Sequence, residues 1–224
     1  ISPIIEEYAQ RAEFPVQIVQ QMGELGCFGP TVPVQYGGGG MDYISYGLMM
    51  QELERGDSGV RSTASVQGSL VMFPIYAFGN EEQKMKYLPK LGSGEWLGCF
   101  GLTEPDHGSN PAGMLSHYTD HGDHVVLNGS KMWISNAPFA QVAVIWAKDE
   151  AGEIRGLILE RGMEDPFLLP FSILADVNHL AGALPLGTLV RVCGQVTHSV
   201  PGEVLWMEAE GAALQVRVPK TPPN

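Results

Sequence analysis

The stretch C-F-G-L-T-E-P-D-H-G-S, from Cys99 to Ser109, marks the point where this chain changes its structural character. An apolar run of strand length ends abruptly there, because Pro105 lacks the backbone N–H that a continuing strand needs. The Thr103 hydroxyl and the neighbouring backbone groups are neutral donors and acceptors, which suit a flat polar heterocycle or a phosphate oxygen. Gly108 and Ser109 allow backbone N–H groups to come close to a ligand. The residues alone leave two interpretations open: a decorated turn, which is the commoner case, and a ligand-binding loop.

The part of the chain before this loop, residues 1–95, has a helical pattern, interrupted by a loop at the four glycines 37–40. Helix-start residues and prolines divide it into segments. We expect helices over 2–27 with Ser2 as N-cap and a break at Pro15, over 43–55 with Asp42 as N-cap, over about 60–78 with Pro74 as a candidate kink, and over 81–88 with an end near Pro89.

The part from the loop onward, residues 96–163, has a strand pattern. Trp96 to Leu102 predicts one strand, and residues 142–148 and 154–160 predict a hairpin around 150–152. Asn128-Gly129, between apolar runs at 124–127 and 131–134, predicts a second hairpin with a type I′ turn. The fold class is therefore α+β: an N-terminal helical bundle followed by a β-barrel-like middle domain.

The tail, residues 164–224, is sparse in charge and has strand-like runs at 188–196, 203–207 and 214–218. Two alternatives are open for it. It completes the β domain, or it forms a small separate β module.

Composition limits the function classes. The 224 residues are 44% hydrophobic and carry a formal net charge of −12, which argues against a general nucleic-acid-binding surface. No apolar stretch is long enough to insert into a membrane. The three cysteines, Cys27, Cys99 and Cys193, form no Cys-x-x-Cys pair, so we expect no metal site and reduced thiols in a cytoplasmic protein. The chain begins without Met or a signal-peptide pattern, which suggests a portion of a longer protein.

Several motifs occur in a specific order. They are E-L-E-R-G-D-S-G-V-R-S at 52–62, S-V-Q-G-S-L-V-M-F-P-I-Y at 65–76, G-N-E-E-Q-K-M-K-Y-L-P-K-L at 79–91, F-G-L-T-E-P-D-H-G-S at 100–109 and K-M-W-I-S-N at 131–136. Together, over about residues 1–163, they resemble the acyl-CoA dehydrogenase family, and within it most closely the glutaryl-CoA dehydrogenases. Several motifs at matching spacing are far more specific than one short pattern.

The resemblance implies a flavoprotein oxidoreductase of fatty acid and amino acid catabolism, with FAD as cofactor and an acyl-CoA as substrate. In that family the α-proton of the acyl-CoA is removed and the β-hydride passes to the flavin. The cofactor-binding residues it implies here are Phe100, Gly101, Leu102, Thr103, Gly108, Ser109, Trp133, Ile134 and Ser135.

The resemblance also implies a substrate site at Arg61, Ser62 and Ser109, with Arg61 pairing with the distal carboxylate of a glutaryl-CoA-like substrate. Without the resemblance, Arg61 is a solvated charge or a partner of Asp57. Glu104 is not expected to be the general base, because the acid of this loop is not the proton acceptor in the family.

The resemblance implies that the catalytic glutamate lies on a C-terminal helical bundle with no counterpart here, so no catalytic residue is assigned. We expect the chain alone to be inactive and the longer protein to be a homo-oligomer. Two alternatives remain: a non-catalytic binding or interaction module made by fusion of a dehydrogenase fragment to a small β module, and a related dehydrogenase that acts on a short-chain acyl-CoA.

Overall fold

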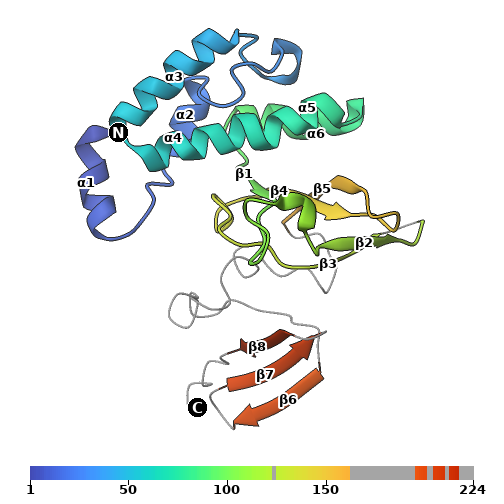
Figure 1. Cartoon of the computed structure of the whole chain (residues 1–224). Helices are drawn as coiled ribbons and strands as arrows, with labels where there is room; N and C mark the ends of the chain where they lie inside the picture. The colour runs from blue at the N-terminus through green and yellow to red at the C-terminus, as the bar shows by residue number, and fades with distance from the viewer. Residues whose placement is uncertain (123–124, 162–194, 201–203, 210–211, 217–224) are drawn as a thin grey trace, which may run out of the picture.

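The computed structural model describes residues 1–122 and 125–161 and three strands beyond them, residues 195–200, 204–209 and 212–216. The first part is helical and packs over a sheet (Figure 1). Its elements are α1 (Ser2–Gln10), α2 (Ile18–Glu24), the 3-10 turn η1 (Val34–Tyr36), α3 (Tyr43–Gly56), α4 (Ser58–Ser65), the π-helix η2 (Val66–Met72), α5 (Phe73–Phe78) and α6 (Glu81–Gly92).

The helix ends agree with several of the expected signals. The predicted break at Pro15 is confirmed, since Pro15 lies between α1 and α2, although the N-cap is Ile1 and Ser2 is already in the first turn. The Oδ1 of Asp42 accepts a hydrogen bond from the Ser45 backbone N–H at 2.7 Å, which confirms the predicted cap of α3. The predicted end near Pro89 is wrong: α6 continues to Gly92, because a proline in the last turn removes only one intrahelical hydrogen bond.

α4, η2 and α5 follow one another without a break over residues 58–78. Pro74 lies in the first turn of α5, and the departure from α-helical geometry comes just before it, in the π-helical turn of η2. This turn is the part of the segment that packs against β1 (Gly98–Gly101). An added Cβ at Gly98 would lie 2.4 Å from Cγ1 of Val71, so the close packing requires glycine there.

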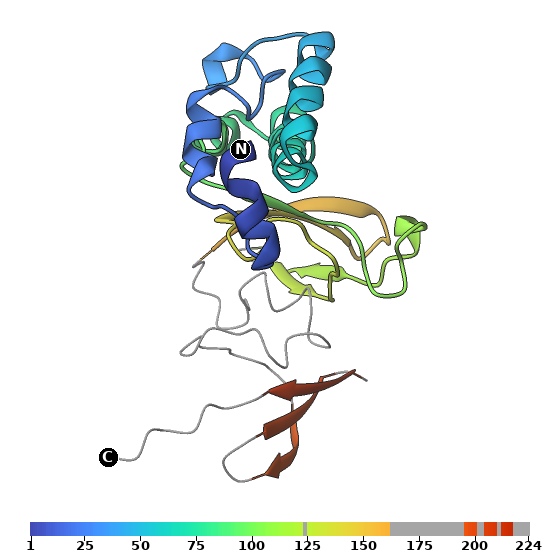
Figure 2. The ribbon, with the colours of Figure 1, turned by 90° about the vertical axis from the view of Figure 1, so that its left-hand side faces the viewer.

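The main core lies between the helices and the sheet, on the sheet face that the helices cover (Figure 2). Met72, Leu88 and Leu91 from the helices are buried in the same cluster as Val142 and Val144 of β4. None of the described helices combines the length and apolar character that crossing a membrane requires.

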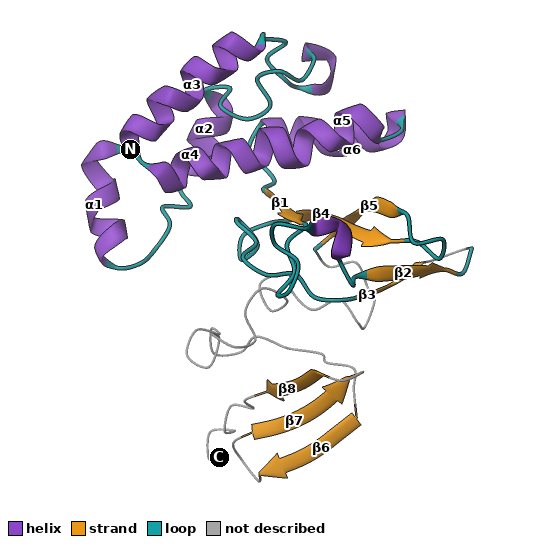
Figure 3. Cartoon of the chain, viewed as in Figure 1, coloured by secondary structure: helices purple, strands orange, loops and turns teal. Residues whose placement is uncertain are grey.

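The sheet contains five strands in the order β1-β4-β2-β3, with β5 paired to β4 (Figure 3). β1 runs parallel to β4, whereas β4–β5 and β2–β3 are antiparallel pairs. The predicted hairpin over 142–160 is confirmed, and so is the α+β class. The remaining strands are β2 (His117–Asp120), β3 (Val125–Asn128), β4 (Val142–Lys148) and β5 (Ile154–Glu160), with the 3-10 turn η3 (Pro111–Gly113) before β2.

The predicted hairpin around Asn128-Gly129 is wrong. β3 pairs with β2, and residues 131–134 form no strand. Gly129 has a φ of +141°, outside the range of a type I′ turn. The physical reason is Lys131, whose side chain is 4% exposed and pairs with Glu104, so this segment lies beside the loop after β1.

In the tail, β6 (Gln195–Val200), β7 (Val204–Ala209) and β8 (Ala212–Val216) form an antiparallel sheet of their own. The expected strands at 203–207 and 214–218 overlap β7 and β8. Most of the expected strand at 188–196 lies outside the described residues.

The joint between the helices and the sheet depends on one buried amide. Gln67 of η2 is fully buried, and its Nε2 donates to the carbonyl oxygens of Leu91 and Trp96, each at 2.8 Å. Its Oε1 accepts from the backbone N–H of Gly98, also at 2.8 Å. One side chain therefore satisfies three backbone groups where the chain passes from α6 into β1.

We predict that Gln67→Leu lowers the free energy of unfolding by about 3 kcal/mol, because it leaves these three backbone groups without their hydrogen-bond partner. The measurement is chemical denaturation of both proteins. Gln51→Leu on the exposed face of α3 is the matched control and should change the free energy by less than about 0.5 kcal/mol. Equal effects of the two substitutions would contradict this role of Gln67.

Candidate functional site

The loop after β1 is built on a tight turn. The backbone N–H of Glu104 donates to the carbonyl oxygen of His107 at 3.3 Å, and the N–H of His107 donates back at 3.2 Å. Pro105 and Asp106 occupy the two central positions, and both are exposed. The T-E-P-D segment therefore reverses the chain just after β1, and Thr103 lies two residues past the end of the strand.

A second segment, residues 131–136, runs beside this loop. The backbone N–H of Met132 donates to the carbonyl oxygen of Thr103 at 2.9 Å. Trp133 is 69% exposed and has a φ of +60°, and Asn136 has a φ of +66°. Residues other than glycine rarely adopt this left-handed backbone conformation, and such backbone strain concentrates at functional sites. The Nδ2 of Asn136 donates to the carbonyl oxygen of Gly98 at 3.1 Å, which anchors the end of the segment to β1.

A buried ion pair lies between the two segments. The Nζ of Lys131 is 2.8 Å from Oε1 of Glu104, and each side chain is 4% exposed. Burial raises the pKa of Glu104, but the hydrogen bonds from Lys131, Ser116 and Leu115 outweigh it and lower the pKa to about 2. A general base works best with a pKa near the operating pH. Glu104 is therefore a fixed negative charge and is poorly suited to accept a proton.

The candidate flavin residues differ in their exposure. Leu102, Thr103 and Ile134 are half-buried, while Gly108, Ser109, Trp133 and Ser135 are exposed. Phe100 is also half-buried, with its ring packed edge-on against Trp146 at a centroid distance of 6.1 Å, and Gly101 is buried against Ile145. These contacts of Phe100 and Gly101 support the strand.

The open part of this site fits the flavin that the resemblance implies. Trp133 presents a large exposed aromatic side chain on the segment that is hydrogen-bonded to Thr103, and the space around Gly108 is open, with no neighbouring atom within 4 Å of an added Cβ. Aromatic stacking area with neutral donors and acceptors at its edge is what a flat heterocycle needs. Within the described residues there is no group of three or more His, Cys, Asp or Glu side chains that could hold a metal ion.

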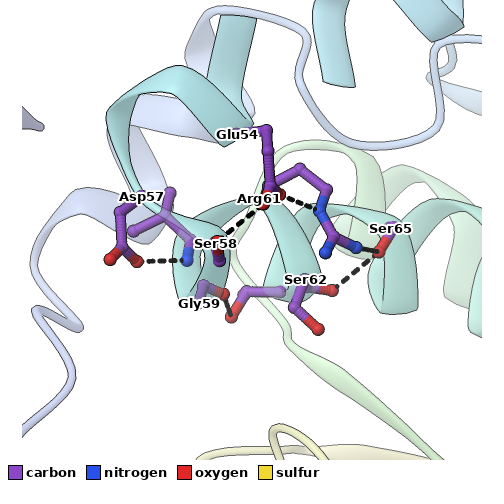
Figure 4. Close-up of polar contacts among 9 residues, drawn as sticks. Glu54, Asp57, Ser58, Gly59, Arg61, Ser62 and Ser65 are labelled. Atoms are coloured by element: carbon purple, nitrogen blue, oxygen red, sulfur yellow. Dashed lines mark hydrogen bonds and ion pairs between the residues drawn. The ribbon is translucent and has the colours of Figure 1, made fainter. Parts of the chain in front are cut away.

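Arg61 lies on α4 within a cluster of polar side chains (Figure 4). Its Nε donates to Oε2 of Glu54 at 2.6 Å, and its Nη1 donates to Oγ of Ser65 at 3.3 Å. The Oγ of Ser58 donates to the other Glu54 oxygen at 2.6 Å, and these hydrogen bonds from Ser58 and Arg61 lower the pKa of Glu54. The guanidinium is thus held by its Nε, and 35% of the Arg61 side chain is exposed.

The alternative prediction, that Arg61 pairs with Asp57, is wrong. The Oδ1 of Asp57 accepts from the backbone N–H of Val60 at 2.8 Å and caps α4. Helical i,i+4 spacing made Asp57 the obvious partner, but Asp57 lies outside the helix at its N-cap. Ser62, the second candidate substrate residue, follows Arg61 on α4, and its carbonyl oxygen accepts from Oγ of Ser65 at 3.0 Å.

Two sets of residues in these sites were not found from the sequence. Glu104 was considered only as a general base, and rejected, and Lys131 only as a strand residue, although a lysine inside an apolar run is a signal for a buried partner. Glu54 was missed because its partner Arg61 is seven residues away and on the next helix.

Comparison with known proteins identifies two matching domains. Residues 1–95 match the acyl-CoA dehydrogenase N-terminal domain, and residues 99–175 match the acyl-CoA dehydrogenase middle domain. The second match continues past residue 163, where the sequence alone showed no further resemblance.

Similar proteins include a glutaryl-CoA dehydrogenase of Desulfococcus multivorans, 43% identical over 161 residues, which cover 70% of this chain and 41% of that protein. The mitochondrial isovaleryl-CoA dehydrogenase of Pongo abelii is 37% identical over 171 residues, 73% of this chain and 40% of that protein. The crystal structure of a glutaryl-CoA dehydrogenase from Mycobacterium smegmatis in complex with FADH2 superposes with a TM-score of 0.69 at 48% identity, covering 71% of this chain and 41% of that one.

The chain thus spans about two fifths of the length of these relatives. Both family matches lie in the expected order, and together they cover the helices and the five-stranded sheet that carry the two candidate sites. The chain belongs to the acyl-CoA dehydrogenase family.

Proposed function

We propose that the protein to which this chain belongs oxidises an acyl-CoA with a distal carboxylate, such as glutaryl-CoA, to the corresponding enoyl-CoA with FAD as cofactor. The observation that carries the proposal is the backbone hydrogen bond from Met132 to Thr103, which holds the loop with the Thr103 hydroxyl next to the segment that carries the exposed Trp133. A glutaryl-CoA dehydrogenase in complex with FADH2 is among the similar structures.

When bound, the flavin would act as the hydride acceptor. The residues of this chain that would hold it are Trp133 for its ring system, Thr103 and Ser135 for its polar edge, and Gly108 and Ser109 through their backbone N–H groups. We assign proton abstraction to no carboxylate of this chain. The chain alone is therefore expected to bind the cofactor without turning over substrate.

The choice of substrate rests on Arg61. A guanidinium offers a planar pair of donors for a carboxylate, and Glu54 and Ser65 hold this one in a defined orientation. A competing hypothesis is that the substrate is a monocarboxylic acyl-CoA. It is supported by the isovaleryl-CoA dehydrogenase among the relatives and by Glu54, which already occupies the guanidinium of Arg61 as its ion-pair partner.

In this proposal the chain divides into a helical domain (1–95), a β domain (96–163) that binds flavin, and a tail (164–224). The substrate residues Arg61 and Ser62 then belong to the first domain. The flavin residues and Ser109 belong to the second.

We predict that FAD binds this chain saturably and that the double variant Thr103→Ala/Trp133→Ala weakens binding by at least about tenfold, because both edge and ring contacts are lost. The measurement is a titration followed by quenching of flavin fluorescence. Phe78→Ala is the matched control, since Phe78 is a 79% exposed aromatic residue in the helical layer. No saturable binding by the unaltered chain, shown to be folded by circular dichroism, would overturn the flavin proposal.

We further predict that the FAD-loaded chain prefers glutaryl-CoA over butyryl-CoA by about tenfold and that Arg61→Ala abolishes this preference, because a charge-assisted hydrogen bond is lost. Arg61→Lys should keep part of it. Arg55→Ala, an exposed arginine paired with Glu52 on α3, is the control. Equal affinity of the unaltered chain for both ligands in calorimetric titration would instead favour the monocarboxylic substrate.

A further inference from the structure

The buried ion pair between Glu104 and Lys131 has more partners than a simple pair. Oε2 of Glu104 accepts from the backbone N–H of Leu115 at 2.6 Å, and Oε1 accepts from that of Ser116 at 3.0 Å. Nζ of Lys131 donates to Oε1 and also to the carbonyl oxygen of Leu102, at 3.2 Å. The pair therefore joins three segments: the loop after β1, the segment before β2, and residues 131–136.

These partners connect the pair to both segments of the open site. Thr103 precedes Glu104 in the chain, Trp133 follows Lys131 by two residues, and the hydrogen bond from Met132 N–H to the Thr103 carbonyl oxygen closes the link between them. The separation of Glu104 and Lys131 is thereby linked through the backbone to that of Thr103 and Trp133. Both charged groups, however, are buried, and neither belongs to the exposed surface of the two loops.

Stability alone does not explain a buried pair. Removing two charges from water costs free energy that their attraction offsets only in part, and replacing such a pair by uncharged residues is often neutral for stability. The geometry of the loops is a more specific benefit, since a site displaced by a fraction of an ångström loses much of its binding.

We propose that Glu104 and Lys131 are positioning residues for the flavin site: they set the separation of Thr103 and Trp133, and hence cofactor affinity and the flavin spectrum, without touching the cofactor. This inference rests on the proposed flavin function. A purely structural role of the pair predicts normal flavin binding in any variant that still folds. A positioning role predicts that a folded protein without the pair binds flavin poorly.

The test is the double variant Glu104→Gln/Lys131→Met, which removes both charges together and so leaves no unpaired buried charge. The matched control is Glu160→Gln/Lys86→Met, which removes the ion pair between α6 and β5. Thermal unfolding of the two cofactor-free proteins establishes that both are folded. FAD affinity and the visible absorption band of the bound flavin are then measured.

The expected result is a folded Glu104/Lys131 variant that binds FAD about tenfold more weakly, with a shifted flavin band, and a control that matches the unaltered chain in both. A folded variant with unchanged affinity and spectrum overturns the proposal. If the double variant does not fold, Glu104→Asp replaces it, with Glu160→Asp as control. The shorter carboxylate keeps the charge but changes the separation, so unchanged FAD binding again overturns the proposal.

A second measurement separates this inference from the proposed function. Hydrogen exchange of the Met132 amide, whose acceptor is the Thr103 carbonyl oxygen, needs no cofactor. It should be about tenfold faster in the Glu104/Lys131 variant, while amides within β4 stay unchanged. If the unaltered chain binds no FAD, the flavin function fails and this exchange rate alone decides on positioning: a Met132 amide as protected as in the unaltered chain overturns it.

Discussion

The structure depends on fixing a short strand at both of its ends with buried polar side chains. β1 has only four residues, and its ends are places where the backbone leaves regular pairing. At its start, the amide of Gln67 satisfies Gly98 N–H together with two carbonyl groups of the preceding segment. Just beyond its end, Lys131 donates to Leu102 and pairs with Glu104. Because buried backbone groups without partners cost much of a domain's net stability, these few side chains determine where helices, strand and loop meet.

The same constraint connects the fold to its chemistry. β1 packs closely against the helical layer through Gln67 and Gly98. On its other side it pairs in parallel with β4. Its far end carries the open loop. In the proposed flavin site, the strand delivers a loop with neutral donors that is hydrogen-bonded to the segment carrying an exposed tryptophan in a left-handed conformation. A flat cofactor would gain affinity from a surface organised in this way before it binds. Charged groups are kept beneath that surface, at Glu104 and Lys131, or on the helical layer, at Arg61.

Much of this arrangement could be predicted from local signals. The Asp42 cap, the break at Pro15 and the β4–β5 hairpin each follow from a residue acting on its near neighbours, so the sequence was sufficient for them. The predicted Asn128-Gly129 hairpin failed because a distant contact, from Lys131 to Glu104, overrides local turn preference. The partner of Arg61 was missed for a similar reason, since Asp57 is at the right spacing but is used as a cap. The residues of both candidate sites came from the family resemblance and not from the physical pattern, which alone left turn and ligand loop as alternatives.

The central claim is that Thr103 and Trp133 together form one cofactor surface. The most direct measurement is a crystal structure of this chain grown with FAD. The isoalloxazine ring is expected against Trp133, with the Thr103 hydroxyl at its polar edge and the Met132–Thr103 hydrogen bond intact. A flavin bound elsewhere on the chain, or a structure in which the two segments separate to admit it, would contradict the account.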